Sequence, residues 1–238
     1  MTEKRVGVWG QTVAAFALVG ALGAGFWAMA QQPEDGRSAE EDAAVCTGGV
    51  ATKADRAAGR VSGDQLCKAL NQPDLAELLG VPGSLATSAY GSGGSVESGG
   101  KKTPTPSGHV EFGGYTVELS ASYDRYAVDA ETAGLLGRDV HAQRLLRRPA
   151  VFYTTQTMGI RLRLDGKDAE STEGVPAEAL TVALDEKNRG GSYDLVLWRD
   201  SGGYPDRTVL LEIAKRVLPR VPGFFGSGAA TPQDAPSS

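Results

Sequence analysis

Two histidines, His109 and His141, are the side chains of this sequence best suited to general acid–base chemistry, because an imidazole titrates near neutral pH. A serine hydrolase would add a nucleophile held on a sharp turn, usually within Gly-x-Ser-x-Gly. Ser92, Ser95 and Ser98 lie among glycines, but none has glycine at both required positions. No partner for either histidine is identifiable beside it. The sequence therefore predicts surface or capping histidines and assigns no catalytic residue.

Phosphate and calcium sites are disfavoured as well. The Gly-Lys pair at 100–101 ends like a phosphate-binding loop, but no strand is expected to lead into it. An acidic stretch begins at Asp185, yet Lys187 and Arg189 fall where a calcium loop needs oxygen ligands. We expect no cofactor and no metal, and we leave open whether the protein is an enzyme, with the balance against it.

A basic stretch stands out in an otherwise acidic chain. It consists of Arg138, Arg144, Arg147 and Arg148, with His141 among them. These arginines could meet an anionic polymer, a lipid headgroup or an acidic partner. The alternative is a solvated loop between a helix and a strand, which is the more frequent explanation of a charge run. The four arginines are kept as candidate contacts for an anionic partner.

The overall charge argues against nucleic acid as a partner. The chain has 238 residues, with 24 Lys and Arg against 29 Asp and Glu, which gives a formal net charge of −5. Binding to phosphate backbones needs a basic footprint, and the chain as a whole does not supply one.

The two cysteines, Cys46 and Cys67, form an even pair on the side of the membrane that we expect to be oxidising. Their spacing does not fit Cys-x-x-Cys chemistry, and two thiolates without nearby histidines make a poor zinc site. We predict a structural disulfide. It would close a loop of about 22 residues and stabilise the fold by roughly 3 kcal/mol.

Residues 6–30 form a long apolar run that follows Lys4 and Arg5. A helix of this length spans roughly 37 Å, which is enough to cross a ~30 Å hydrocarbon core. Trp9 and Trp27 lie near its ends, where indole rings favour the membrane interface. The sequence therefore predicts one transmembrane helix, so that the membrane itself is a partner of the chain.

The charges beside this run predict its orientation. Basic residues stay on the cytoplasmic side, so residues 1–5 are expected in the cytoplasm and residues 31–45 form an acidic stalk outside. This places the protein in the cell membrane, with its C-terminal domain extracytoplasmic. A signal peptide cleaved after Ala30 remains the alternative, although the length of the apolar run favours retention.

Beyond the stalk, residues 46–222 are expected to form one domain. A capping box at Ser62–Gln65 and a proline at Pro73 predict two short helices, and further helices are expected at 129–136 and 206–218. Residues 83–108 are rich in Gly, Ser, Thr and Pro, which predicts a flexible loop. A polar loop is expected at 166–177 and a disordered tail at 223–238.

Alternation of apolar and polar residues predicts the strands. The Gly113-Gly114 pair predicts a hairpin, and the strand at 193–198 is apolar on both sides, which predicts a central position. The expected fold is an α+β class, with an N-terminal transmembrane helix followed by an antiparallel sheet of about six strands covered by helices. The strands are expected near 110–112, 115–123, 151–155, 160–164, 180–184 and 193–198.

Several segments carry a resemblance to known proteins. The stretches VSGDQLCKALNQPDLAELLGVPG, LLGRDVHAQRLLRRPAVFY, SYDLVLWRD and VLLEIAKRVLPRVPG resemble a family of actinobacterial single-pass membrane proteins of unknown function. That family brings no assigned activity or site residues. The element order is also distantly similar to PsbP-like domains of envelope lipoproteins, which implies a binding or accessory role. This chain lacks a lipidated cysteine, so only the analogy of fold carries over.

We therefore expect a membrane-anchored extracytoplasmic binding or accessory module of the bacterial cell envelope, with an unknown protein or envelope component as its partner. The alternatives are an envelope hydrolase with an unrecognised site, a cleaved secreted protein, and an assembly factor that works through its membrane segment. A deep pocket holding a histidine beside a carboxylate would favour the enzyme, and a shallow apolar groove would favour binding.

Overall fold

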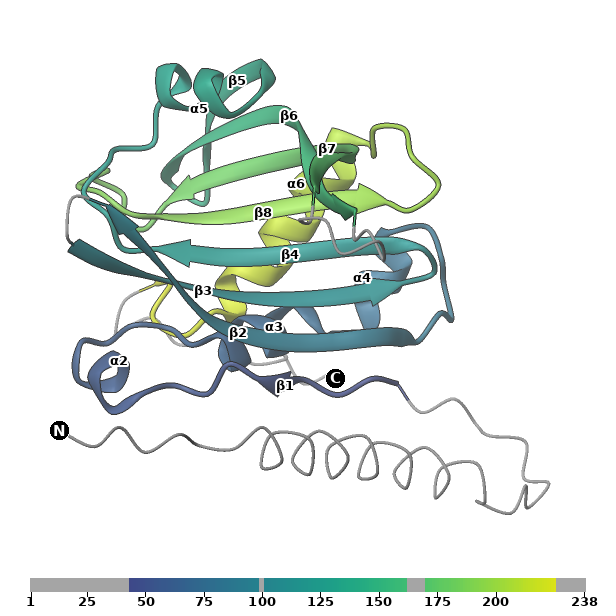
Figure 1. The fold of residues 1–238 in the computed structure, drawn as a ribbon, viewed down its shortest axis with the longest axis horizontal. Coiled ribbons are helices and arrows are strands. Elements are labelled where there is room, and N and C mark those ends of the chain that lie inside the picture. The colour runs from purple at the N-terminus through teal and green to yellow at the C-terminus, as the bar shows by residue number, and fades with distance from the viewer. Residues whose placement is uncertain (1–42, 99–100, 162–169, 226–238) are drawn as a thin grey trace, which may run out of the picture. The chain divides into compact units, whose positions relative to one another are not determined.

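The structure, a computed structural model, describes residues 43–98, 101–161 and 170–225 (Figure 1). Its helices are α2 (Lys53–Ala57), α3 (Gly63–Leu70), α4 (Pro73–Leu78), α5 (Ala130–Leu136) and α6 (Arg207–Val217), and the 3-10 turn η1 (Leu218–Arg220) follows α6. Its strands are β1 (Thr47–Gly48), β2 (Ala86–Ser98), β3 (Lys101–Phe112), β4 (Tyr115–Ser122), β5 (Arg138–Leu145), β6 (Arg148–Arg161), β7 (Glu170–Ala183) and β8 (Ser192–Arg199).

The strands of the described part form a single sheet in the order β1-β2-β3-β4-β8-β7-β6-β5. The chain forms two antiparallel meanders, β2–β3–β4 and β5–β6–β7–β8. Antiparallel pairing of β4 with β8 joins the two meanders into one sheet. The short β1 runs parallel to β2, so the sheet is mixed. The predicted central position of the strand at 193–198 is confirmed, because β8 lies between β4 and β7.

The expected fold class is wrong. The sheet has eight strands rather than about six, it is mixed rather than antiparallel, and its helices are few and short. The predicted transmembrane helix at 6–30 lies outside the described residues. Within the part of the chain that the structure describes, no helix is long and apolar enough to span a bilayer.

The largest error concerns residues 83–108, which form most of the β2–β3 hairpin instead of a flexible loop. Glycine and hydroxyl side chains suggested a segment without enough apolar surface to order itself. The glycines have another use here, because Gly91 and Gly108 lie against the backbone of α3 where no Cβ would fit. Backbone contact with a helix replaces the missing apolar side chains, and pairing with β4 supplies the remaining order.

Smaller errors occur at strand ends. Part of the polar loop expected at 166–177 belongs to β7, which starts at Glu170, and the basic stretch from Arg138 forms the edge strand β5. The predicted tail begins too early, because Phe224 is buried in the core. The hairpin at Gly113-Gly114 is confirmed, since Phe112 pairs with Tyr115 across it.

Local capping explains where three helices begin. The Ser62 side chain accepts a hydrogen bond from the Gln65 amide, and the Gln65 side chain accepts one from the Ser62 amide, which confirms the predicted capping box of α3. Asp129 and Asp206 accept hydrogen bonds from backbone amides in the first turns of α5 and α6. These helix starts can be predicted from the sequence because each capping hydrogen bond joins residues no more than three positions apart.

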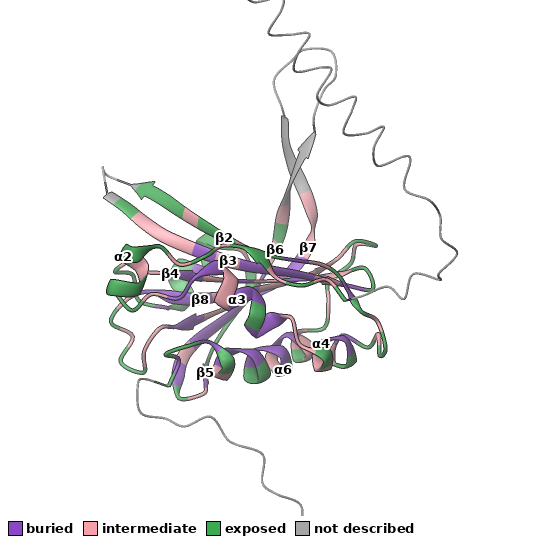
Figure 2. Ribbon diagram, turned by 90° about the horizontal axis from the view of Figure 1, so that it is seen from below, coloured by how far each residue is buried: buried purple, intermediate pink, exposed green. Residues whose placement is uncertain are grey.

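The main core lies between one face of the sheet and helices α3, α4 and α6, and we call this the helix face (Figure 2). Every second side chain of the strands points to this face and packs against helical residues. These include Leu66, Leu70, Leu210 and Ile213, all with no exposed surface. We call the opposite side of the sheet the open face. In Figure 2, the coloured outer part of the β2–β3 hairpin rises on this side, away from the helices.

Candidate functional site

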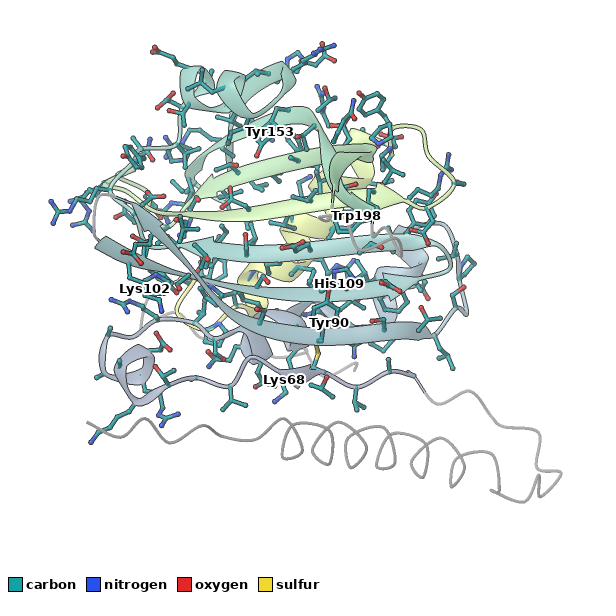
Figure 3. All side chains as sticks on the ribbon, in the orientation of Figure 1. Lys68, Tyr90, Lys102, His109, Tyr153 and Trp198 are labelled. Atoms are coloured by element: carbon teal, nitrogen blue, oxygen red, sulfur yellow. A yellow bond between two sulfur atoms is a disulfide. The ribbon has the colours of Figure 1, made fainter. Side chains whose placement is uncertain are left out.

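The open face is defined by one row of paired residues that crosses the sheet. Tyr90 pairs with His109, His109 with Glu118, and Glu118 with Val196. Because directly paired residues point to the same side of a sheet, these side chains share the open face. Tyr153 on β6 continues the row through Ala179 on β7. Figure 3 shows the labelled residues Tyr90, His109, Trp198 and Tyr153 spread over this face.

The structure places His109 within this row. Its Nε2 lies 3.0 Å from Oε1 of Glu111, and its ring stacks on the ring of Tyr90 at a centroid distance of 4.5 Å. Trp198 approaches the imidazole from β8, with a centroid distance of 5.9 Å. Burial raises the pKa of Glu118, while the neighbouring His109 lowers it to a smaller extent. A carboxylate partner for His109 is therefore present, which the sequence did not reveal.

His141 has no comparable surroundings. It lies on the edge strand β5, opposite Phe152, and is exposed. Among the described residues, no hydrogen bond or ion pair joins it to another side chain. Within the described ranges, no three His, Cys, Asp or Glu side chains are placed together so that they could hold a metal ion.

A groove lies on the open face beside the segment that leads into α5. It consists of two hollows of about 500 Å³ each, and both are lined by Val96, Ser122, Asp124 and Tyr126. The outer hollow extends along the β2–β3 hairpin past Thr105. The inner hollow continues under α5, where its lining includes Asp129, Leu136, Tyr153, Thr181, Ser192 and Asp194. We call the two together the open-face groove.

Asp194 is a half-buried lining residue of the inner hollow. Its Oδ1 accepts a hydrogen bond of 2.6 Å from the Thr181 hydroxyl, and its Oδ2 accepts one of 2.8 Å from the Ser192 hydroxyl. Protein atoms surround the carboxyl densely, yet the residue keeps some accessible surface, as expected for a group that lines a hollow. Burial raises its pKa, the two hydroxyl hydrogen bonds lower it, and nearby Asp124 raises it further.

Two more carboxylates face the groove from the segment before α5. Asp124 is fixed by the Ser122 hydroxyl at 2.7 Å and by the Tyr126 amide at 2.8 Å. Asp129 caps α5 through the Thr132 amide at 2.7 Å. Within the described residues, no Lys or Arg forms an ion pair with Asp124, Asp129 or Asp194.

Large apolar side chains border the groove and remain exposed. Val96 on β2 is 57% exposed, Tyr126 is 74% exposed, and Leu136 at the end of α5 is 59% exposed. Single exposed apolar residues are ordinary on protein surfaces. Three that line the same hollow, together with the half-buried polar groups of Thr181 and Asp194, are the arrangement expected of a ligand site.

The four predicted arginines do not form one patch. Arg148 is buried against the ring of Phe224, with 3.8 Å from the guanidinium carbon to the ring centroid, and it donates to the carbonyls of Ala183, Leu184 and Phe224. Arg147 is exposed and pairs with Glu186 at 3.1 Å. The other two, Arg138 and Arg144, are exposed on β5. Their role as contacts for an anionic partner stays a prediction for the three exposed arginines.

The predicted disulfide is confirmed. Cys46 and Cys67 are bonded, with their Cα atoms 5.9 Å apart. The bond joins the segment at β1 to the middle of α3, which packs on β2 and β3. It therefore fastens the start of the domain to its core.

Sequence reasoning missed the groove residues for an identifiable reason. Asp194 stands in a strand that is otherwise apolar on both sides, and a charged residue in a central strand is itself a signal of function. Strand register brings Thr181 opposite Asp194, and the fold brings Asp124 near it, whereas Ser192 lies two positions before it on β8. In the sequence, the signal of this site was therefore Asp194 alone, because only the fold shows that Thr181 and Asp124 lie near it.

Comparison with known proteins gives one result. No curated protein and no solved structure matches the chain. The model of a family of unknown function, DUF6215, matches residues 3–139, which is more than half of the 238-residue chain. The protein belongs to this family of unknown function, DUF6215.

Proposed function

We propose that this protein is an extracytoplasmic binding or accessory module of the bacterial cell envelope, and that it receives its ligand in the open-face groove. One observation carries the proposal: the half-buried polar side chains of Thr181 and Asp194 line a hollow to which large apolar side chains are exposed, among them Tyr126 and Leu136. An ordinary solvated sheet face has its polar groups in water. Here the polar groups lie in a hollow whose exposed apolar side chains can cover the apolar part of a ligand.

The disulfide supports the extracytoplasmic part of the proposal, because structural disulfides persist in oxidising compartments. We also propose that the domain is held at the outer face of the cell membrane through the apolar segment 6–30, with the N-terminus in the cytoplasm. An actinobacterial origin belongs to the same proposal and is supported by the quoted sequence segments. The distant kinship with PsbP-like modules rests on the element order expected from the sequence.

The groove can be tested by filling it. Ala127 is exposed and lines the inner hollow. Ala127→Trp therefore fills part of the hollow, and it removes no hydrogen bond because a methyl side chain forms none. Ala57→Trp on α2 is the matched control, because α2 contributes no lining residue to either hollow. Full-length protein with each substitution would be recovered from native membranes, and co-purifying molecules would be identified by mass spectrometry.

We expect a specific molecule to accompany the wild-type protein and the Ala57→Trp variant, and to be lost from Ala127→Trp. Equal recovery with all three proteins would contradict a role for the groove. Circular dichroism and the thermal midpoint of each variant would establish that the loss does not come from unfolding.

An envelope hydrolase is the second candidate, and the contact between His109 and Glu111 favours it. In that case His109→Ala would abolish product release from envelope preparations, while a ligand bound in the groove would stay associated. Mass spectrometry of soluble products before and after adding the protein would detect such turnover.

A further inference from the structure

The geometry points to a small organic cation as the ligand of the open-face groove, with a primary ammonium group near Asp194 and Asp124 and a short apolar body along the border. This inference rests on the proposed function and names the chemical class of the ligand. Three properties of the groove support it: its charge, the environment of Asp194, and the separation of the half-buried carboxylates from the exposed apolar side chains.

The charge of the groove is one-sided. Asp124, Asp129 and Asp194 line the inner hollow, and no Lys or Arg is found among its described lining residues. Arg125 lines only the outer hollow. Three carboxylates without a cationic partner in the described part of the protein produce a negative potential, which attracts a cation and repels an anion.

The environment of Asp194 is incomplete without a ligand. The hydrogen bonds that it accepts in the described structure come from two neutral hydroxyls, those of Thr181 and Ser192, and each occupies one carboxylate oxygen. A carboxylate oxygen has a second lone pair, so each can accept one more donor. Enclosing a carboxylate without a cation is costly, and an ammonium group in the hollow would offset that cost with charge-assisted hydrogen bonds.

The separation of the half-buried carboxylates from the exposed apolar side chains indicates an amphipathic ligand. Asp124 and Asp194 are half-buried and line the inner hollow with the buried Tyr153, whereas Asp129 is exposed. Val96, Tyr126 and Leu136 are the large apolar side chains of the exposed border. An ammonium group on a short alkyl chain matches both parts. Aromatic rings of the lining can add attraction for a cation through their faces.

The experiment compares three probes that share a four-carbon chain: n-butylammonium, 1-butanol and butyrate. Binding to the purified full-length protein would be measured by saturation-transfer difference NMR and titrated at low and high salt. We expect n-butylammonium to bind best, butyrate not to bind, and the affinity for the cation to fall as salt screens the carboxylates. The variants Asp194→Asn and Asp124→Asn should each weaken cation binding about tenfold, the usual loss for a charge-assisted hydrogen bond.

Asp64→Asn on the helix α3 is the matched control, because it removes one carboxylate that pairs with Lys68 far from the groove lining. It should leave the affinity for n-butylammonium unchanged. Equal binding of all three probes, preference for butyrate, or full affinity in both groove variants would overturn the cationic class. If these probes fail while Ala127→Trp still removes the co-purifying molecule, the groove remains a binding site and only the cationic class is wrong.

Discussion

The Cα of Gly108 in β3 lies directly against the backbone of Cys67 in α3, with no space for a Cβ between them. On the neighbouring strand, Gly91 meets the backbone of Gly63 at the start of the same helix. Two strands and one helix thus approach each other through backbone atoms. This contact fixes the inner half of the β2–β3 hairpin, whose outer half borders the groove.

Gly108→Ala should lower the free energy of unfolding by about 1–3 kcal/mol, because a methyl group there must push α3 away from the sheet. Gly93→Ala on β2 is the control, since a Cβ at Gly93 meets no atom within 4 Å. Urea denaturation followed by circular dichroism would compare them. Equal stability of both variants would show that the helix does not depend on this approach.

Loss of the disulfide should destabilise the domain by about 3 kcal/mol, the chain-entropy value for a loop of this size. Cysteines Cys46 and Cys67 are 21 positions apart and are bonded in the structure. The urea midpoint should therefore fall when a reductant is added, and the double variant Cys46→Ser/Cys67→Ser should show the lower midpoint with and without reductant. An unchanged midpoint would mean that the bond does not restrain the unfolded chain.

Arg148→Ala should cost about 2–4 kcal/mol, because it removes packing on Phe224 and leaves buried carbonyls without donors. The adjacent Arg147→Ala should change stability by less than about 0.5 kcal/mol, since Arg147 is 81% exposed and its pair with Glu186 is solvated. Thermal unfolding would measure both. Limited proteolysis should also release the segment around Phe224 faster from the Arg148 variant.

The pH dependence of stability should reflect three enclosed carboxyls. Burial raises the pKa of Glu118, Glu178 and Asp194 above the ordinary values of 4.5 for Glu and 3.8 for Asp. The folded chain then holds these protons more tightly than the unfolded chain, so stability falls as pH rises from the ordinary values through the raised ones. Asp206 behaves oppositely, because its lowered pKa makes its contribution disappear as pH falls through that value.

We therefore expect greatest stability at weakly acidic pH and a decline toward neutrality. Asp194→Asn should flatten that decline, because the substituted amide does not titrate. Urea midpoints between about pH 4 and pH 8 would measure the slope. A slope unchanged by the substitution would mean that Asp194 has the same pKa in the folded and unfolded chains.

The proposed orientation at the membrane predicts the activity of reporter fusions. Alkaline phosphatase folds only where its disulfides form, so a fusion after residue 45 should be active and one at residue 3 inactive. Immunoblots of both fusions would control for expression. The reverse pattern would place the domain in the cytoplasm and remove the extracytoplasmic proposal.

The parts of the fold that the sequence predicted are those with local causes. The helix at Ser62 follows from its capping box, and the hairpin at Gly113-Gly114 follows from turn residues between alternating strands. The β2–β3 hairpin was missed because its order comes from contacts with α3 and β4, so that its composition resembles that of a loop. The groove was missed for a related reason, since Asp194 and Asp124 are 70 positions apart in sequence.

The bond between Cys46 and Cys67 also decides how tension would enter the domain. Among the described residues, β1 pairs with β2 at two positions and the preceding Ala44 amide donates to the Ala86 carbonyl, so few contacts with the sheet would resist a pull from the N-terminal side. The covalent link passes that load directly to α3, whose Leu66 and Leu70 are fully enclosed. If the domain is tethered by its N-terminal end, as proposed, the disulfide anchors it through α3 in the core, and the edge of its sheet bears little of the load.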